Sequence, residues 1–107
     1  MKFFFDDNGY PSIKASDDFR ILTDFIKDDI QRSIYGVNEF INACELVKSG
    51  ILPFWEGTGN SHTVTIRPHC VELFNEYTEE SMVISSIDEF KGYLDKWRAL
   101  ISGENSL

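Results

Sequence analysis

The spacing of hydrophobic residues changes along this chain, and that change constrains the fold more than any other feature. Between residues 62 and 67, His62, Val64 and Ile66 alternate with polar residues, which is the period of a strand with one buried face. Over residues 87–101 the apolar positions are spaced by three and four, as in a helix packed on one side. A chain with both patterns favours helices laid against one face of a sheet.

A short turn predicts a hairpin at the start of the chain. Residues 2–5 and 10–14 flank Asn8 and Gly9, and glycine tolerates the positive φ that such a turn requires. We therefore expect two short antiparallel strands before the first helix.

Two amphipathic segments predict central helices. Ser16 is a suitable N-cap for a helix whose apolar positions run over residues 19–34. Gly36 interrupts this pattern, and the same spacing resumes over residues 37–48. The two segments are expected to form either a helical hairpin or one bent helix.

The second half of the chain predicts strands followed by a helix. Residues 53–60 are rich in glycine and read as a loop with a possible edge strand, whereas residues 70–77 and 82–85 read as strands. Ser86 and Glu89 then have the spacing of a capping box at the start of the last helix.

These elements predict an α+β fold in one domain. We expect an antiparallel sheet of about four to five strands, with the N-terminal hairpin, two central helices and a C-terminal helix packed on the sheet. A chain of 107 residues with 42% hydrophobic and 14% aromatic residues has enough apolar surface for one core. The domain is expected to span residues 1–107, with a frayed tail at 102–107.

Acidic residues dominate the charge of the chain. There are 18 Asp and Glu against 10 Lys and Arg, which gives a formal net charge of -8. No basic residue lies between Arg67 and Lys91, but six acidic residues do: Glu72, Glu76, Glu79, Glu80, Asp88 and Glu89. This balance opposes nucleic-acid binding, which depends on cationic contacts to phosphates, and favours a basic protein partner.

The first central helix carries a second acidic pair. Asp24 and Asp28 are four residues apart, so they share one side of a helix and repel each other. Arg20 and Arg32 have the spacing to neutralise them, which would leave an ordinary solvated face. The alternative is that this face is a surface for a basic partner, and the sequence leaves both open.

Candidate catalytic groups are few. His69 precedes Cys70, but neighbouring strand residues point to opposite faces, which disfavours a thiol–imidazole pair. His62, His69 and Cys70 lack the paired spacing of a zinc site, and the loop over residues 57–60 lacks the lysine and following helix of a phosphate cradle. We expect no catalytic residue, no metal site and no cofactor.

Two further features concern compartment and core. Cys44 and Cys70 lie in unrelated segments, which favours reduced thiols, and no apolar run is longer than the three residues at 3–5. We expect a cytoplasmic protein that does not bind membranes. Phe54 and Trp55 are either core residues or an exposed aromatic anchor, and burial is the favoured alternative.

Both ends of the chain resemble a known group of proteins. The chain opens with MKFFFDDNGY, and its last strand leads into Ser86-Ile87-Asp88-Glu89-Phe90 and then Trp97-Arg98. In this layout the chain resembles immunity proteins of bacterial contact-dependent growth inhibition systems. The resemblance implies a protein that neutralises the C-terminal nuclease domain of a cognate, surface-delivered toxin.

Charge and resemblance predict the same mechanism. We expect an immunity protein that binds a basic nuclease domain one-to-one and blocks its active site or substrate-binding surface by charge and steric occlusion. The alternative is a small acidic regulatory or adaptor domain with no toxin partner. No small-molecule substrate is expected. The candidate binding residues are Asp24, Asp28, Glu72, Glu76, Glu79 and Glu80.

Overall fold

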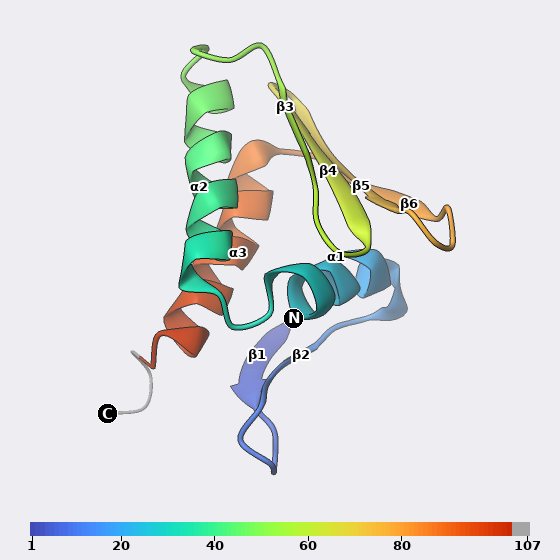
Figure 1. Cartoon of the computed structure of the whole chain (residues 1–107), viewed down its shortest axis with the longest axis vertical. Helices are drawn as coiled ribbons and strands as arrows, with labels where there is room; N and C mark the ends of the chain where they lie inside the picture. The colour runs from blue at the N-terminus through green and yellow to red at the C-terminus, as the bar shows by residue number, and fades with distance from the viewer. Residues whose placement is uncertain (104–107) are drawn as a thin grey trace.

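The computed structural model describes residues 1–103 and confirms the predicted α+β fold. Helices α2 and α3 stand side by side on one side of a four-stranded sheet, and the N-terminal hairpin lies beyond their lower ends (Figure 1). The elements in chain order are β1 (Lys2–Phe5), β2 (Pro11–Lys14), η1 (Asp17–Phe19), α1 (Arg20–Phe25), η2 (Ile26–Ile30), α2 (Ile34–Lys48), β3 (Trp55–Thr58), β4 (His62–Arg67), β5 (Cys70–Asn75), β6 (Ser81–Ile84) and α3 (Ile87–Ile101).

The four strands of the sheet are antiparallel and pair in chain order, β3-β4-β5-β6. The predicted edge strand is therefore present, as β3. The N-terminal hairpin forms a separate two-stranded sheet, in which Lys2 pairs with Lys14. Its turn is closed by the Asp6 carboxylate, which accepts hydrogen bonds from the backbone N–H groups of Asn8 and Tyr10, both at 2.9 Å.

One face of the sheet is buried under the helices and forms the core. The side chains of Val64, Ile66, Val71 and Leu73 point to this side and are fully buried. Helix α3 adds the stripe predicted from its spacing, with Ile87, Phe90, Leu94 and Trp97 buried and Ile101 half-buried. The opposite face of the sheet has no covering layer among the described residues (Figure 1).

The first central helix differs from the prediction. It consists of a short α-helix, α1, that runs into a π-helical turn, η2, and it ends at Ile30 rather than at residue 34. Gln31 has a positive φ of 55°, and its carbonyl accepts a 2.7 Å hydrogen bond from the Trp97 indole. The apolar spacing continues past Ile30, but the hydrogen bond from the distant Trp97 to Gln31 favours an end of the helix at Ile30.

Helix α2 begins earlier than predicted, and Gly36 does not interrupt it. The Ser33 hydroxyl accepts a hydrogen bond from the Gly36 N–H at 2.9 Å, so Ser33 is the N-cap and Gly36 lies in the first turn. The break between the central helices falls at residues 31–33. The two segments therefore form separate helices, and the one-bent-helix alternative is wrong.

The ends of α3 follow the predicted signals. The Ser86 hydroxyl accepts from the Glu89 N–H at 3.0 Å, as in a capping box, while the Glu89 carboxylate accepts from the Tyr93 hydroxyl at 2.8 Å. Within the predicted tail at 102–107, the Ser102 N–H donates to the Arg98 carbonyl at 2.9 Å, and residues 104–107 lie outside the described residues. No helix within residues 1–103 has the length and apolar character needed to span a membrane.

Candidate functional site

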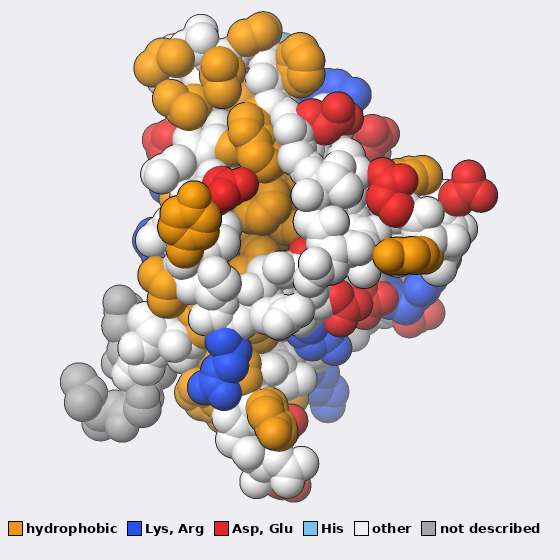
Figure 2. All heavy atoms as spheres, viewed as in Figure 1, with side chains coloured by type: hydrophobic (Ala, Val, Ile, Leu, Met, Phe, Trp, Pro, Cys, Tyr) orange, Lys and Arg blue, Asp and Glu red, His pale blue; other side chains and the backbone are white. Residues whose placement is uncertain are grey.

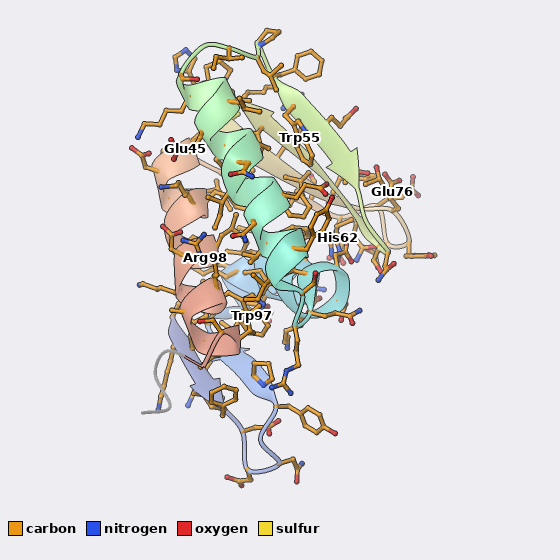
Figure 3. The ribbon with its side chains drawn as sticks, turned by 60° about the vertical axis from the view of Figure 1, so that its left-hand side comes forward. Glu45, Trp55, His62, Glu76, Trp97 and Arg98 are labelled. Atoms are coloured by element: carbon orange, nitrogen blue, oxygen red, sulfur yellow. The ribbon has the colours of Figure 1, made fainter. Side chains whose placement is uncertain are left out.

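The open face of the sheet gathers three carboxylates. Residues directly opposite each other on paired strands share a face, so the strand register places two rows of side chains there. One row is Glu56, Thr65, Glu72 and Val83, and the other is Thr58, Thr63, Phe74 and Ser81. Glu76 follows β5 at the end of this face, on the side away from the helices (Figure 3). We call these residues together the acidic face.

A shallow hollow of about 260 Å³ lies in the acidic face. Threonine hydroxyls orient two of its carboxylates: Thr65 donates to Glu56 at 3.2 Å, and Thr63 donates to Glu76. The side chains around the hollow are Glu56, Thr63, Thr65, Glu72, Phe74, Glu76 and Ser81. The face therefore combines charge, hydroxyl groups and one aromatic ring on a rigid support.

Little positive charge offsets these carboxylates. Arg67 lies 3.8 Å from Glu72, with both side chains close to half-exposed. Among the described residues, neither Glu56 nor Glu76 forms an ion pair. The acidic face is consequently negative overall, and Figure 2 shows Asp and Glu side chains spread along the side of the molecule formed by the strands.

Glu79 and Glu80, two of the predicted binding residues, both lie in the β5–β6 turn but differ in their ion pairing. Glu80 forms a 2.6 Å ion pair with Arg20, and the hydrogen bond from Arg20 lowers the pKa of the Glu80 carboxyl, with a smaller effect from Thr78. Glu79 is exposed, with a positive φ of 61°, and forms no ion pair with any described residue. Glu79 thus adds free charge beside the acidic face, whereas the charge of Glu80 is already matched.

Asp24 and Asp28 are not brought to the acidic face. Asp24 lies on α1 and Asp28 on η2, and α1 packs against β5 and β6 from the side of the buried core. Neutralisation by Arg20 and Arg32, one of the two alternatives that the sequence left open, does not form as ion pairs among the described residues. Arg20 pairs with Glu80 instead of Asp24, and within residues 1–103 no ion pair joins Arg32 to Asp28.

Glu56 belongs to the acidic face but was not a candidate from the sequence. Its segment was predicted as a loop with a possible edge strand, and only the pairing of β3 with β4 sets Glu56 opposite Thr65. The available signal was that possible edge strand, in which Glu56 follows the aromatic Trp55 and so points to the opposite face.

A second group that sequence reasoning missed is a buried pair, Asp29 and His62. The Asp29 carboxylate accepts hydrogen bonds from the backbone N–H groups of Ser61 and His62, at 3.1 and 2.8 Å, and lies 3.4 Å from the His62 Nδ1. Both side chains are at most 1% exposed. Asp29 follows Phe25 by four residues, so a carboxylate at a core position of the predicted helix was the signal.

The neighbours of His62 define its hydrogen-bonding state. Asn75 Oδ1 accepts from the backbone N–H groups of Tyr77 and Thr78, which directs Asn75 Nδ2 toward His62 Nε2 at 3.5 Å. An amide donor facing Nε2 pairs with the acceptor nitrogen of the ring, which leaves Nδ1 as the donor toward Asp29. With both nitrogens engaged and no exposed surface, His62 joins the β3–β4 turn to η2 and is closed to acid–base chemistry on a bound molecule.

The glycine-rich turn after β3 packs against the Asp29 carboxylate of the same chain. A Cβ added to Gly59 would lie 2.7 Å from Asp29 Oδ2, so the turn packs closely over this carboxylate. Asp29 therefore occupies the N–H groups of Ser61 and His62, which a bound phosphate would need.

Neither cysteine is hydrogen-bonded to a histidine in the described part of the chain. Cys44 is buried, and burial raises the pKa of its thiol to about 12. Cys70 pairs with Arg67 across the β4–β5 turn, and no hydrogen bond joins it to His69 or His62 within residues 1–103. No group of three or more His, Cys, Asp and Glu side chains in the same residues is placed to hold a metal ion.

Comparisons of the chain with protein-family models, with curated proteins and with solved structures each find no match.

Proposed function

We propose that this protein is a non-catalytic inhibitor that binds a basic nuclease toxin domain through the acidic face. The observation that carries the proposal is the grouping of Glu56, Glu72 and Glu76 around one hollow, with a single ion pair to offset them in the described chain. The resemblance to immunity proteins supplies the class of partner. The net charge of -8 supplies long-range attraction to a basic surface.

The hollow suits the side chain of an arginine or lysine from the partner. Glu56 and Glu72 flank Thr65 in one row, so a guanidinium entering between them meets carboxylate oxygens on two sides. Phe74 adds an apolar surface on which the cation or its aliphatic stem can lie. A nuclease holds phosphates with such cations, and their capture by the acidic face would remove them from substrate.

The rigidity of the acidic face favours tight binding. Glu56 and Glu72 stand on paired strands, and threonine hydroxyls hold Glu56 and Glu76, so little freedom of these side chains is lost when the complex forms. Steering by the surplus negative charge would raise the association rate, and this gain should weaken as salt is added.

The first experiment identifies the partner. The tagged chain is expressed in its native host, bound proteins are recovered, and each basic protein is tested for cleavage of RNA and DNA with and without the purified chain. We expect a nuclease whose activity is lost at a one-to-one ratio. A basic partner without nuclease activity would instead support the adaptor alternative.

The second experiment tests the acidic face itself. Glu76→Lys and Asp7→Lys each change the formal net charge from -8 to -6, because a negative charge is replaced by a positive one. Asp7 lies in the exposed turn of the N-terminal hairpin, away from the sheet (Figure 1). We expect Glu76→Lys to slow association about tenfold and to flatten its salt dependence, and Asp7→Lys to change the rate less than about twofold. Equal effects of the two variants would contradict binding through this face.

A further inference from the structure

A second surface feature lies on the other side of β3, between this strand and helix α2. An apolar groove of about 340 Å³ runs along α2, and Figure 2 shows hydrophobic side chains along its floor. Tyr35, Ala43 and Leu46 of α2 line it together with Trp55 of β3. Tyr35 is 79% exposed and Leu46 38% exposed, so apolar surface is left uncovered along the length of the helix.

The groove is bordered by a free strand edge. Strand β3 pairs only with β4, so its other edge carries no strand. The Gly59 N–H donates to the His62 carbonyl at 2.9 Å, and this bond defines which residues face β4. Counting back by twos, Gly57 and Trp55 direct their backbone groups toward β4, and Thr58 and Glu56 direct theirs to the free edge.

Trp55, which lines the groove, is held in place by contacts with Gly57 and Phe40. The Trp55 ring lies over Gly57, since a Cβ added to that glycine would be 2.3 Å from the ring. It also packs edge-on against Phe40 of α2, with ring centroids 5.4 Å apart. In Figure 3 Trp55 lies between α2 and β3. A preformed wall of this kind lowers the entropy cost of binding a ligand.

Polar groups at the rim define the chemistry of the occupant. Asn38 and Asn42 lie one turn apart on α2. The Asn38 Oδ1 already accepts a hydrogen bond from Arg98 at 2.9 Å, so Asn38 offers its amide N–H groups to the groove and Asn42 offers a donor and an acceptor. Glu39 also lines it and forms no ion pair with any described residue. The groove thus combines an apolar floor, a free strand edge and one unmatched negative charge.

We propose that an extended segment of a partner protein binds in this groove by adding to β3 as a fifth strand. Its backbone would bond with Glu56 and Thr58, alternate apolar side chains would rest on Trp55, and a lysine or arginine would face Glu39. A second copy of this chain is the weaker occupant, because both copies carry a net charge of -8 and each would bring Glu56 to the shared edge. The two proposals use different groups of β3: the acidic face uses the side chains of the strand, whereas strand addition uses the outward backbone groups of Glu56 and Thr58.

The test uses a defined probe and the full chain. A phage library of random decapeptides is selected on the immobilised protein, and the best binder is synthesised. We expect enriched peptides to alternate apolar and polar residues and to contain lysine or arginine. Binding of the synthetic peptide should slow hydrogen exchange at the Glu56 and Thr58 amides and leave Gly57, which already faces β4, unchanged.

Matched variants separate strand addition from other contacts. Thr58→Pro removes an outward N–H without removing a bond to β4, and Thr58→Val keeps that N–H with nearly the same shape. We expect the first to weaken the peptide about fivefold or more and the second less than about twofold. If Thr58→Pro unfolds the protein, the exchange measurement on the unaltered chain decides.

Three outcomes would overturn the proposal. The library could yield no peptide above background, or the binders could leave the Glu56 and Thr58 amides exchanging as before. Protection of these amides that rises with protein concentration in the absence of peptide would show that a second copy occupies the groove. Loss of peptide binding in a variant that still inhibits the nuclease would leave the proposed function standing.

Discussion

Replacement of Asp29 by alanine tests how strongly tertiary contacts hold η2 against the β3–β4 turn. The carboxylate is 1% exposed and accepts hydrogen bonds from two backbone N–H groups, those of Ser61 and His62. The His62 Nδ1, at 3.4 Å, is a weaker third partner. In Asp29→Ala the two backbone donors lose their acceptor.

The cost follows from the number of donors. Hydrogen bonds to a charged group contribute about 1.5–3 kcal/mol each, so two of them amount to about 3–6 kcal/mol. Removal of one negative charge from a chain of net charge -8 relieves some repulsion, which brings the expectation to about 3–5 kcal/mol. Since small domains unfold with about 5–15 kcal/mol, this is a large part of the total.

The measurement is urea unfolding followed by circular dichroism. With an m value of about 1.5 kcal/mol per molar, the midpoint of Asp29→Ala should fall by about 2–3 M. Asp29→Asn keeps the shape and one acceptor, so about half of this loss is expected. Asp28→Ala is the matched control: Asp28 is exposed, its carboxylate has no partner among the described residues, and its loss should cost less than about 0.5 kcal/mol.

A loss below about 1 kcal/mol in Asp29→Ala, or one equal to that of Asp28→Ala, would refute this reasoning. It would mean that water or a shifted turn satisfies Ser61 and His62 as well as the carboxylate does.

Two further predictions concern packing and thiol chemistry. Gly57→Ala should displace the Trp55 ring and destabilise the fold by about 1–3 kcal/mol, since the added Cβ lies 2.3 Å from the ring, whereas Gly92→Ala meets open space on α3 and should stabilise it by about 0.5–1 kcal/mol. Urea midpoints that shift in the same direction for both variants would contradict this packing. At pH 8 a thiol reagent should modify Cys70 and leave Cys44 intact until the protein unfolds, because burial raises the pKa of Cys44 to about 12 and keeps it from attack. Rapid modification of two thiols in the folded protein would show that the core opens.

Most of the fold could be predicted because it depends on local patterns. The N-terminal hairpin, strands β4 and β5, and the capping box at Ser86 all follow from residues close together in the chain. The first central helix was predicted too long because its end depends on a long-range contact rather than on a local pattern. Its apolar spacing continues past Ile30, but Trp97 bonds to the Gln31 carbonyl from the far end of the chain.

The candidate site could be predicted only in part. Glu72 and Glu76 were recognised from an excess of charge, and the structure places both on the acidic face. Glu80 belongs to the same acidic run, yet it is matched by Arg20, sixty positions away in the sequence. Local spacing in the sequence cannot predict this ion pair, because the pair depends on how α1 packs against β5 and β6.

The sequence by itself determined the elements, the buried face of each and the surplus of negative charge, since all three depend on residue type and short-range spacing. Only the tertiary structure decided which carboxylates stand together. Strand register places Glu56 and Glu72 in one row, on either side of Thr65, and chain packing buries Asp29 with His62. Register and packing arise from contacts between residues far apart in the chain, so free energies summed over the whole core, rather than any local pattern, select them.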